Sequence, residues 1–203
     1  MYPDYYVNWI KNAPYHSIAR QNQILLALKN VFISINKSSA IDSLLKLNLL
    51  PSECNLALSN GPGEGTSILH VLVESATRHN MEQAYHDLCH LITHFPELDF
   101  NVPAQKGDCQ GISPFYLLTS IAGGATVDKC NHALVMSRAY ELINLIVNHE
   151  LKVEWFKAYA SPYYDKNKSP ISWIIEAANK MRHPDALEIL NILKLNHSNA
   201  LKC

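Results

Sequence analysis

The stretch Gly65-Thr66-Ser67-Ile68-Leu69-His70 decides the fold, because two later segments repeat its pattern. The copies are Gly111-Ile112-Ser113-Pro114-Phe115-Tyr116 and, in a degraded form, Asn167-Lys168-Ser169-Pro170-Ile171-Ser172. A turn residue, a hydroxyl and a hydrophobic residue at fixed spacing, each time followed by helical patterns, mark a structural repeat. The sequence therefore predicts turn–helix–loop–helix units that bury their apolar faces by stacking on one another.

Two helical stretches follow each copy of the pattern. The predicted helices span 68–78 and 81–95, then 111–122 and 133–149, then 170–180 and 184–195. Their apolar residues recur with the helical period, so each second helix has one face to bury. In the first two units these faces consist of Ala84, Leu88, Leu91, Ile92 and Phe95, and of Val135, Ala139, Leu142, Ile143 and Ile146. The copies are unequally spaced, which places the extra residues mainly in the connectors 123–132 and 151–166.

The amino-terminal part predicts less regular helices, over 4–12, 17–35 and 40–49, with Pro51-Ser52-Glu53 ending the last of them. The expected buried stripe of the second helix consists of Ile18, Leu25, Leu26, Leu28, Val31, Phe32 and Ile35. An aromatic group, Tyr2, Tyr5, Tyr6, Trp9 and Tyr15, opens the chain and is expected to cover an exposed end of the array. We predict an atypical helical cap over 1–60 and repeats over 61–203, in units of about 64–105, 109–160 and 165–203.

Composition and charge restrict the function classes. With 48% hydrophobic and 17% charged residues, the chain can form a real core. With a net charge of −1 and a pI near 6.8, the chain lacks the excess of positive charge that is typical of proteins that bind nucleic acid or an anionic membrane. The sequence has no run apolar enough to span a bilayer and no signal-peptide pattern at its start. Five cysteines without CxxC spacing predict reduced thiols, so we expect a soluble, cytoplasmic chain.

These residues resemble the ankyrin repeat, whose units open with Gly-x-Thr-Pro-Leu-His. Ser67, Ser113 and Ser169 correspond to the family threonine, and Pro114 and Pro170 to its proline. The core leucine corresponds to Leu69, Phe115 and Ile171, and His70 alone keeps the histidine. Two features depart from the family. Its paired alanines are replaced by Leu72-Val73, Leu118-Thr119 and Ile174-Ile175, and both repeat intervals exceed its period of about 33 residues.

The resemblance implies an all-α, ankyrin-like helical-hairpin solenoid that acts as a non-enzymatic protein-binding module. In that family the turn tips and the exposed ends of the first helices line the binding surface. The matching positions here are Glu64, Thr66, Glu74, Gln110, Ile112, Ser120, Lys166, Lys168 and Glu176. The expected partner is an unidentified protein bound by a monomeric chain, without a cofactor.

A second candidate contact region is an aromatic connector before the last unit. It contains Trp155, Phe156, Tyr159, Tyr163 and Tyr164. Tryptophan and tyrosine are frequent anchors of protein interfaces, so Trp155, Tyr159, Tyr163 and Tyr164 are predicted partner contacts. Local packing of the connector against the helices is an equal alternative.

The chain is rich in Asn, Lys and Ile, and its repeats are irregular. In both respects it also resembles ankyrin-repeat effectors that intracellular bacteria such as Legionella deliver into host cells. Virus-encoded ankyrin proteins look similar. A bacterial effector would be secreted into the host cell, and its partner would be a host protein. The sequence names neither the host nor the partner.

The sequence offers only weak motifs for phosphate binding, metal binding or catalysis. The segment Gly61–Ser67 lacks the lysine of a phosphate-binding loop. His86, His90 and His94 share one helix face at metal-ligand spacing, but that face lies opposite the apolar arc and is expected to be a solvated stripe. His70 is expected to be a structural, hydrogen-bonded histidine. The alternative function is an effector-like enzyme in which Cys109 or Cys130 meets a histidine in a pocket formed by the connectors.

Overall fold

A computed structural model describes residues 18–61, 63–79, 81–104, 109–124, 132–159 and 168–200. In these ranges the chain is all-α, and β-type pairing is restricted to isolated bridges in the loops. A π-helical segment, η1 (Ala177–Met181), directly follows α9. The α-helices are α2 (Ile18–Ile33), α3 (Lys37–Leu45), α4 (Pro51–Cys54), α5 (Ile68–Ala76), α6 (Glu82–His94), α7 (Pro114–Ala122), α8 (His132–Asn148), α9 (Pro170–Glu176) and α10 (Pro184–Ala200).

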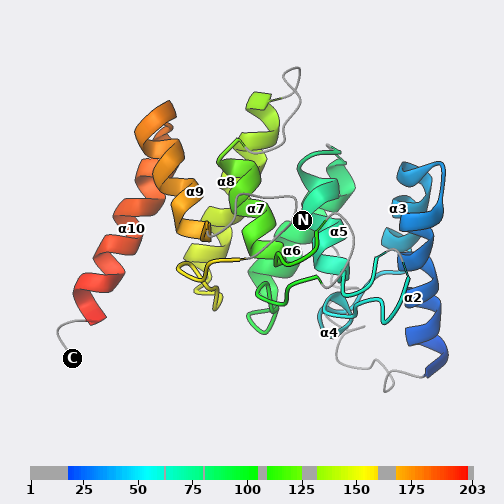
Figure 1. Cartoon of the computed structure of the whole chain (residues 1–203). Helices are drawn as coiled ribbons and strands as arrows, with labels where there is room; N and C mark the ends of the chain where they lie inside the picture. Colours follow the sequence, from blue (N-terminus) through cyan, green and yellow to red (C-terminus); the bar gives the residue numbers. More distant parts are fainter. Residues whose placement is uncertain are drawn as a thin grey trace.

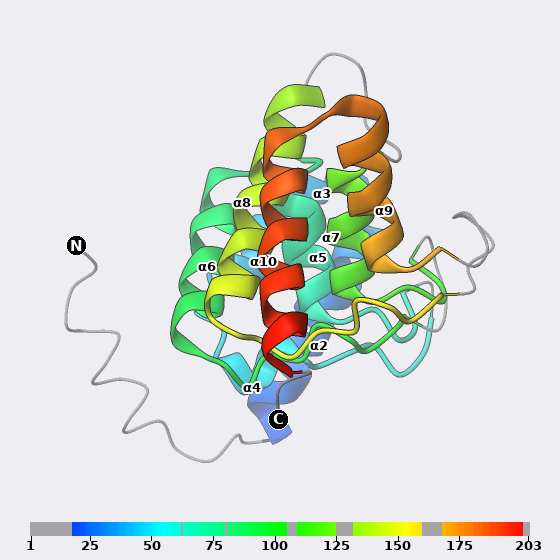
Figure 2. The same cartoon turned by 90° about the vertical axis from the view of Figure 1, so that its left-hand side faces the viewer.

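The helices form antiparallel hairpins that lie side by side in chain order (Figure 1). The pairs are α2 with α3, α5 with α6, α7 with α8 and α9 with α10. Seen from the end of the row, α5, α7 and α9 make one layer, and α6, α8 and α10 make the other (Figure 2). Neighbouring hairpins touch through both layers, since α7 packs on α5 and α9 while α8 packs on α6 and α10.

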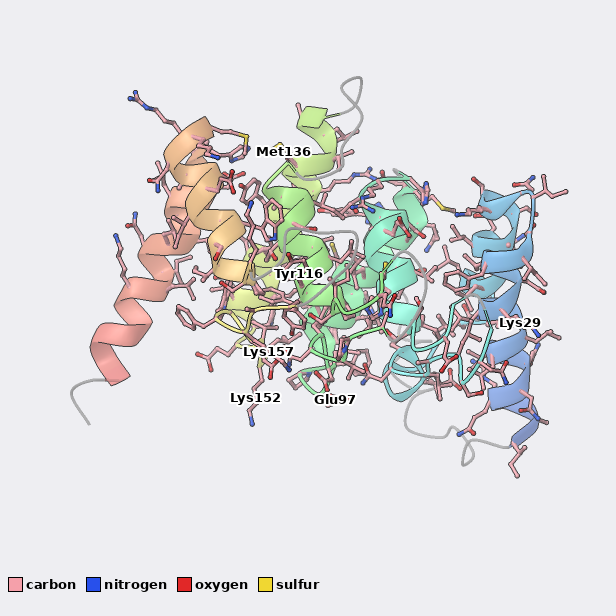
Figure 3. The ribbon with its side chains drawn as sticks, viewed as in Figure 1. Lys29, Glu97, Tyr116, Met136, Lys152 and Lys157 are labelled. Carbon is pink, nitrogen blue, oxygen red and sulfur yellow. The ribbon has the colours of Figure 1, made fainter. Side chains whose placement is uncertain are left out.

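One apolar core runs through the row, from Ile24 and Leu28 in α2 to Ile189 in α10. Its middle is α7, whose residues are all buried. Tyr116 of this helix lies near the centre of the row in Figure 3 and is completely buried. The Thr119 and Ser120 hydroxyls of this helix donate to its own carbonyl oxygens, to Tyr116 O at 3.0 Å and to Leu117 O at 2.7 Å. Burial of α7 therefore leaves few polar groups to satisfy.

The repeated serines occupy the same structural position. Ser67, Ser113 and Ser169 are the N-cap residues of α5, α7 and α9, each with extended backbone angles (φ −88°, −91° and −103°). Ser113 Oγ accepts the N–H of Tyr116 at 3.1 Å. Ser169 N–H instead donates to Ser172 Oγ at 3.4 Å. Each cap satisfies amide groups that the first helical turn leaves without partners.

The loop before each of these helices is closed in the same way. The N–H groups of Leu58, Ala104 and Tyr159 donate to the carbonyl oxygens of Thr66, Ile112 and Lys168, at 3.3, 2.9 and 3.2 Å. In the first two loops a glycine follows the turn with positive φ, 76° at Gly65 and 77° at Gly111. A side chain is strained in that conformation, which explains the glycine at both places.

The structure confirms the helices predicted in the three units and their buried faces, with Phe95 only partly covered. The expected source of the unequal spacing is partly wrong. More residues separate α7 from α8 (123–131) than separate α5 from α6 (77–81), as predicted, but α8 is also longer than α6, with 17 residues against 13. The two outgoing loops, 95–113 and 149–169, are similar in length. The stretch 151–166 is therefore no large insertion relative to the unit before it.

The amino-terminal predictions need more correction. In α2 the buried residues are Ile24, Leu28 and Val31, whereas Ile18 and Leu26 are exposed at 77% and 60%. Ile35 lies beyond the helix end and is exposed as well. Pro51 begins α4 instead of ending a helix, because proline suits the first helical position. The predicted helix over 4–12 and the aromatic group Tyr2, Tyr5, Tyr6, Trp9 and Tyr15 lie outside the described residues.

Candidate functional site

The loop tips that precede α5, α7 and α9 are the region in which the sequence places partner contacts. The described parts of these loops gather on the side of the molecule that carries these helices, away from α6 and α8 (Figure 2). Glu97, Lys152 and Lys157 lie along the lower edge of the row in Figure 3. Rigid helices that present neighbouring loops are a common arrangement for binding surfaces.

Four predicted contact residues are buried and offer little surface to a partner. Thr66 and Ile112 are 3% and 0% exposed, because each follows the turn and points into the core. Ser120 is 0% exposed within α7, and Tyr159 is 4% exposed beneath its loop. The matching of positions to the ankyrin pattern missed the burial of Ser120, since every residue of α7 is enclosed between neighbouring helices.

The remaining described positions keep at least part of their side chain at the surface. Gln110 is exposed at the tip of the second loop, and Glu64 is partly exposed at the tip of the first. Glu74 forms an ion pair with Arg78 at 3.2 Å, with 37% of its side chain exposed. Tyr163, Tyr164 and Lys166 lie outside the described residues.

Lys168 and Glu176 pair with one another. Lys168 Nζ lies 2.7 Å from Glu176 Oε2 and 3.8 Å from the ring centre of Trp173. The hydrogen bond from Lys168, together with one from Lys180, lowers the pKa of Glu176 to about 2. A partner that used either residue would have to compete with this ion pair, which reduces the free energy such a contact can contribute.

The aromatic connector packs back on α7. The Trp155 ring lies edge-on to Phe115, with the ring centres 4.8 Å apart, and Tyr159 lies 5.2 Å from Tyr116. Tyr159 OH donates to Glu154 Oε2 at 3.1 Å. Phe156 differs, because 65% of its surface is exposed. Local packing thus describes Tyr159 and most of Trp155, and in the described part of the connector Phe156 is the aromatic side chain that stays exposed.

The histidines of α6 lie on its outer face. His86 is 51% exposed and forms an ion pair with Glu82 at 3.1 Å, whereas His90 and His94 stack on each other with ring centres 4.4 Å apart. Burial and the neighbouring imidazole of His94 lower the pKa of His90. In the described part of the chain, no group of three or more His, Cys, Asp or Glu residues could hold a metal ion.

The described cysteines are poorly suited to nucleophilic chemistry. Cys54 is fully buried, and burial raises the pKa of its thiol to about 12. Burial also raises the pKa of Cys89, which is only partly covered. A thiol with a raised pKa carries little thiolate at neutral pH, and the thiolate is the nucleophile. Cys109 is buried at 8% exposure, and Cys130 lies outside the described residues.

A pocket of about 320 Å³, which the sequence did not reveal, lies where α3 meets α6. Its apolar lining includes Leu45, Leu72 and Leu91. Its polar lining includes Asp42 from α3, Lys46 directly after α3, and Gln83, Asp87 and His90 from α6. Asp42 and Lys46 lie four residues apart, as do Gln83 and Asp87, but no local pattern indicates that these two segments face each other across neighbouring hairpins.

No protein-family model matches the chain, and neither a curated protein nor a solved structure matches it. No helix among the described residues combines the length and apolar character that crossing a membrane requires.

Proposed function

We propose that this chain is a divergent ankyrin-type repeat protein that acts as a non-enzymatic protein-binding module. The observation that carries the proposal is the equivalence of Ser67, Ser113 and Ser169, which cap successive first helices with the same backbone geometry. The loops before them close through matching backbone hydrogen bonds. Repetition at this level supports stacked units of one kind, and stacked units commonly use their extended surface for binding.

The proposed binding surface runs along the loop tips. Its described members are Glu64, Glu74, Gln110 and Phe156, with Trp155 contributing its exposed part. Both acidic and aromatic groups are present, which suits a protein surface with mixed chemistry. Rigid capping and loop hydrogen bonds support this role, because a preorganised surface loses little conformational entropy on binding.

The proposed partner is a protein. The abundance of Asn, Lys and Ile and the irregular repeats support a partner in a host cell, where the chain would act as a bacterial effector. A monomer that presents one loop surface is the simplest form of this proposal.

Affinity capture with a matched pair of variants tests the proposal. Gln110→Lys combined with Phe156→Ser changes two exposed side chains at the loop tips, whereas Glu188→Lys changes an exposed side chain of α10. Wild-type protein and the Glu188→Lys variant are expected to retain the same proteins from a eukaryotic lysate, and the double variant is expected to lose them. Circular dichroism of all three proteins checks that the fold is intact.

Two outcomes contradict the proposal. The first is equal retention by the double variant, which would remove the loop tips from the contact surface. The second is loss of an enzymatic activity on thiol alkylation of the native protein, which would favour the cysteine–histidine alternative. A partner that is retained unchanged after alkylation supports binding without thiol chemistry.

A further inference from the structure

The pocket between α3 and α6 combines an apolar floor with unpaired carboxylates at its rim. Leu45, Leu72 and Leu91 line its apolar part. Leu72, which replaces an alanine of the ankyrin pattern, is 1% exposed, so this floor belongs to the core and is firmly held. At about 320 Å³ the pocket is at the lower end of the range for ligand sites, roughly 300 to 1,000 Å³. It can take one extended side chain but no large cofactor.

The carboxylates at the rim lack a cationic partner. Among the described residues, Asp42 accepts no side-chain hydrogen bond and forms no ion pair, and the one side chain that donates to Asp87 is the neutral amide of Gln83, at 2.8 Å. Partial burial raises the pKa of Asp87, and its effect exceeds the opposing effects of the Gln83 hydrogen bond and of the positive charge of His86. A ligand cation would relieve this cost.

The other ionisable groups of the pocket leave it a net negative charge. Burial and His94 lower the pKa of His90, so this imidazole is neutral at pH 7. Lys46 contributes one positive charge, but its side chain is exposed and can turn toward water. The two carboxylates of Asp42 and Asp87 outnumber the single ammonium group of Lys46, so the pocket favours a cationic ligand.

We propose that this pocket binds a cationic group on an aliphatic stem, as presented by an arginine or lysine side chain of a peptide. The stem lies on the leucine floor, and the charged head reaches Asp87 and Asp42. A guanidinium group fits best, because it can donate two parallel hydrogen bonds to one carboxylate. The inference concerns the region between α3 and α6 and is independent of the proposed loop surface.

Nuclear magnetic resonance titration of the full chain with N-acetyl-arginine amide tests the proposal. The amide resonances of residues 83–91 are expected to shift and saturate, with a dissociation constant of about 1 mM for a ligand of this size. N-acetyl-lysine amide provides a second cation. N-acetyl-citrulline amide, which has nearly the shape of the arginine derivative without its charge, is expected to bind at least about tenfold more weakly.

Variants with opposite expected effects sharpen the test. Asp87→Asn is expected to weaken arginine binding about fivefold or more, and Lys46→Gln to strengthen it about twofold, because the two changes alter the local charge in opposite directions. Glu188→Gln on α10 removes a remote carboxylate and is expected to change nothing. If Asp87→Asn does not fold, Asp42→Asn at the exposed edge of the pocket replaces it.

The proposal is overturned if citrulline binds as well as arginine, or if shifts fall outside the pocket. It is also overturned if no shift occurs up to about 50 mM ligand, or if the Asp87 and Lys46 variants leave the affinity unchanged. None of these results bears on capture of a partner by the loop tips, so the two proposals fail separately.

Discussion

His70 and Ile112 join two neighbouring hairpins: the imidazole Nε2 donates a hydrogen bond to the carbonyl oxygen of Ile112, 42 residues further along the chain, at 3.0 Å. On the other side of the ring, Nδ1 accepts the N–H of Ser67 at 3.2 Å. Both ring nitrogens are therefore used, and the proton of the neutral imidazole lies on Nε2. His70 therefore connects Ser67, the N-cap residue of α5, with the loop that precedes α7.

Replacing His70 by alanine should cost about 2 to 4 kcal/mol of unfolding free energy, because the change removes the acceptor of the buried Ser67 N–H and one of the two hydrogen bonds to the Ile112 carbonyl, and it opens a cavity. Urea unfolding followed by circular dichroism measures this loss. His86→Ala is the matched control: its side chain is 51% exposed, so the expected change is within about 0.5 kcal/mol. A His70→Ala protein as stable as the control would show that the bridge between hairpins contributes nothing.

Acid should destabilise the fold through the same imidazole. Burial lowers the pKa of His70 from 6.5 to about 4, so the unfolded chain binds a proton more readily than the folded chain. The stabilisation is complete above pH 6.5 and is lost as the pH falls toward 4, by about 3 kcal/mol in total. Unfolding curves across this window measure the slope.

A His70→Gln variant isolates this effect from other titrations. The pKa of Glu176 is lowered to about 2, so its contribution changes mainly below the His70 window. The pKa of His90 is also lowered, and its titration acts in the same direction in both proteins. The His70→Gln variant should therefore show a clearly flatter pH dependence than wild type. Parallel curves would mean that His70 is not the group responsible.

The helices of the central units could be predicted because their sequence signals are local. A serine cap, a proline at the first helical position and a helical apolar period all lie within a few residues of each other around Ser113 and Pro114. The same is true of the single apolar face of α6. Where local signals agree, the sequence determines both the type of element and the side that is buried.

The features that were missed depend on contacts between distant segments. The helix α2 carries aliphatic residues on two faces, so periodicity alone could not exclude Ile18 and Leu26 from the core. Burial of Ser120 depends on how closely α5 and α9 enclose α7. The pocket around Asp42 and Asp87 exists only because two hairpins meet there. None of these contacts has a signature within one segment of sequence.

The ion pair between Arg20 and Glu53 should stabilise the amino-terminal helices. Arg20 Nε lies 3.0 Å from Glu53 Oε1, and its Nη2 also donates to the carbonyl oxygen of Leu47 at 2.8 Å. The Glu53 side chain is 2% exposed, so Arg20→Met should leave a buried charge unpaired and cost about 3 kcal/mol. Urea unfolding measures the loss, and Lys29→Met, at an outward-pointing lysine of the same helix (Figure 3), should change little.

A double variant separates the ion pair from simple packing. Arg20→Met combined with Glu53→Leu removes both charges and should recover at least about 1 kcal/mol relative to Arg20→Met alone. Losses that simply add would indicate that the two side chains stabilise the fold independently. That result would contradict a coupled pair.

Gly123→Ala should destabilise the protein, although this substitution usually stabilises a chain by about 0.4 to 1 kcal/mol where the backbone accepts it. The φ of Gly123 is −77°, which alanine adopts without strain, but an added Cβ would lie 2.9 Å from Cε3 of Trp173. The expected cost is about 1 to 3 kcal/mol, because the indole is packed and can yield little. The same substitution in a Trp173→Leu background removes the contact with Cε3 but keeps those with the β-carbon at 3.1 Å and the carbonyl oxygen at 3.3 Å, so the cost should be smaller there. Urea unfolding of the four proteins measures both effects, and a stabilising Gly123→Ala in the wild-type background would refute the close approach of α7 and α9.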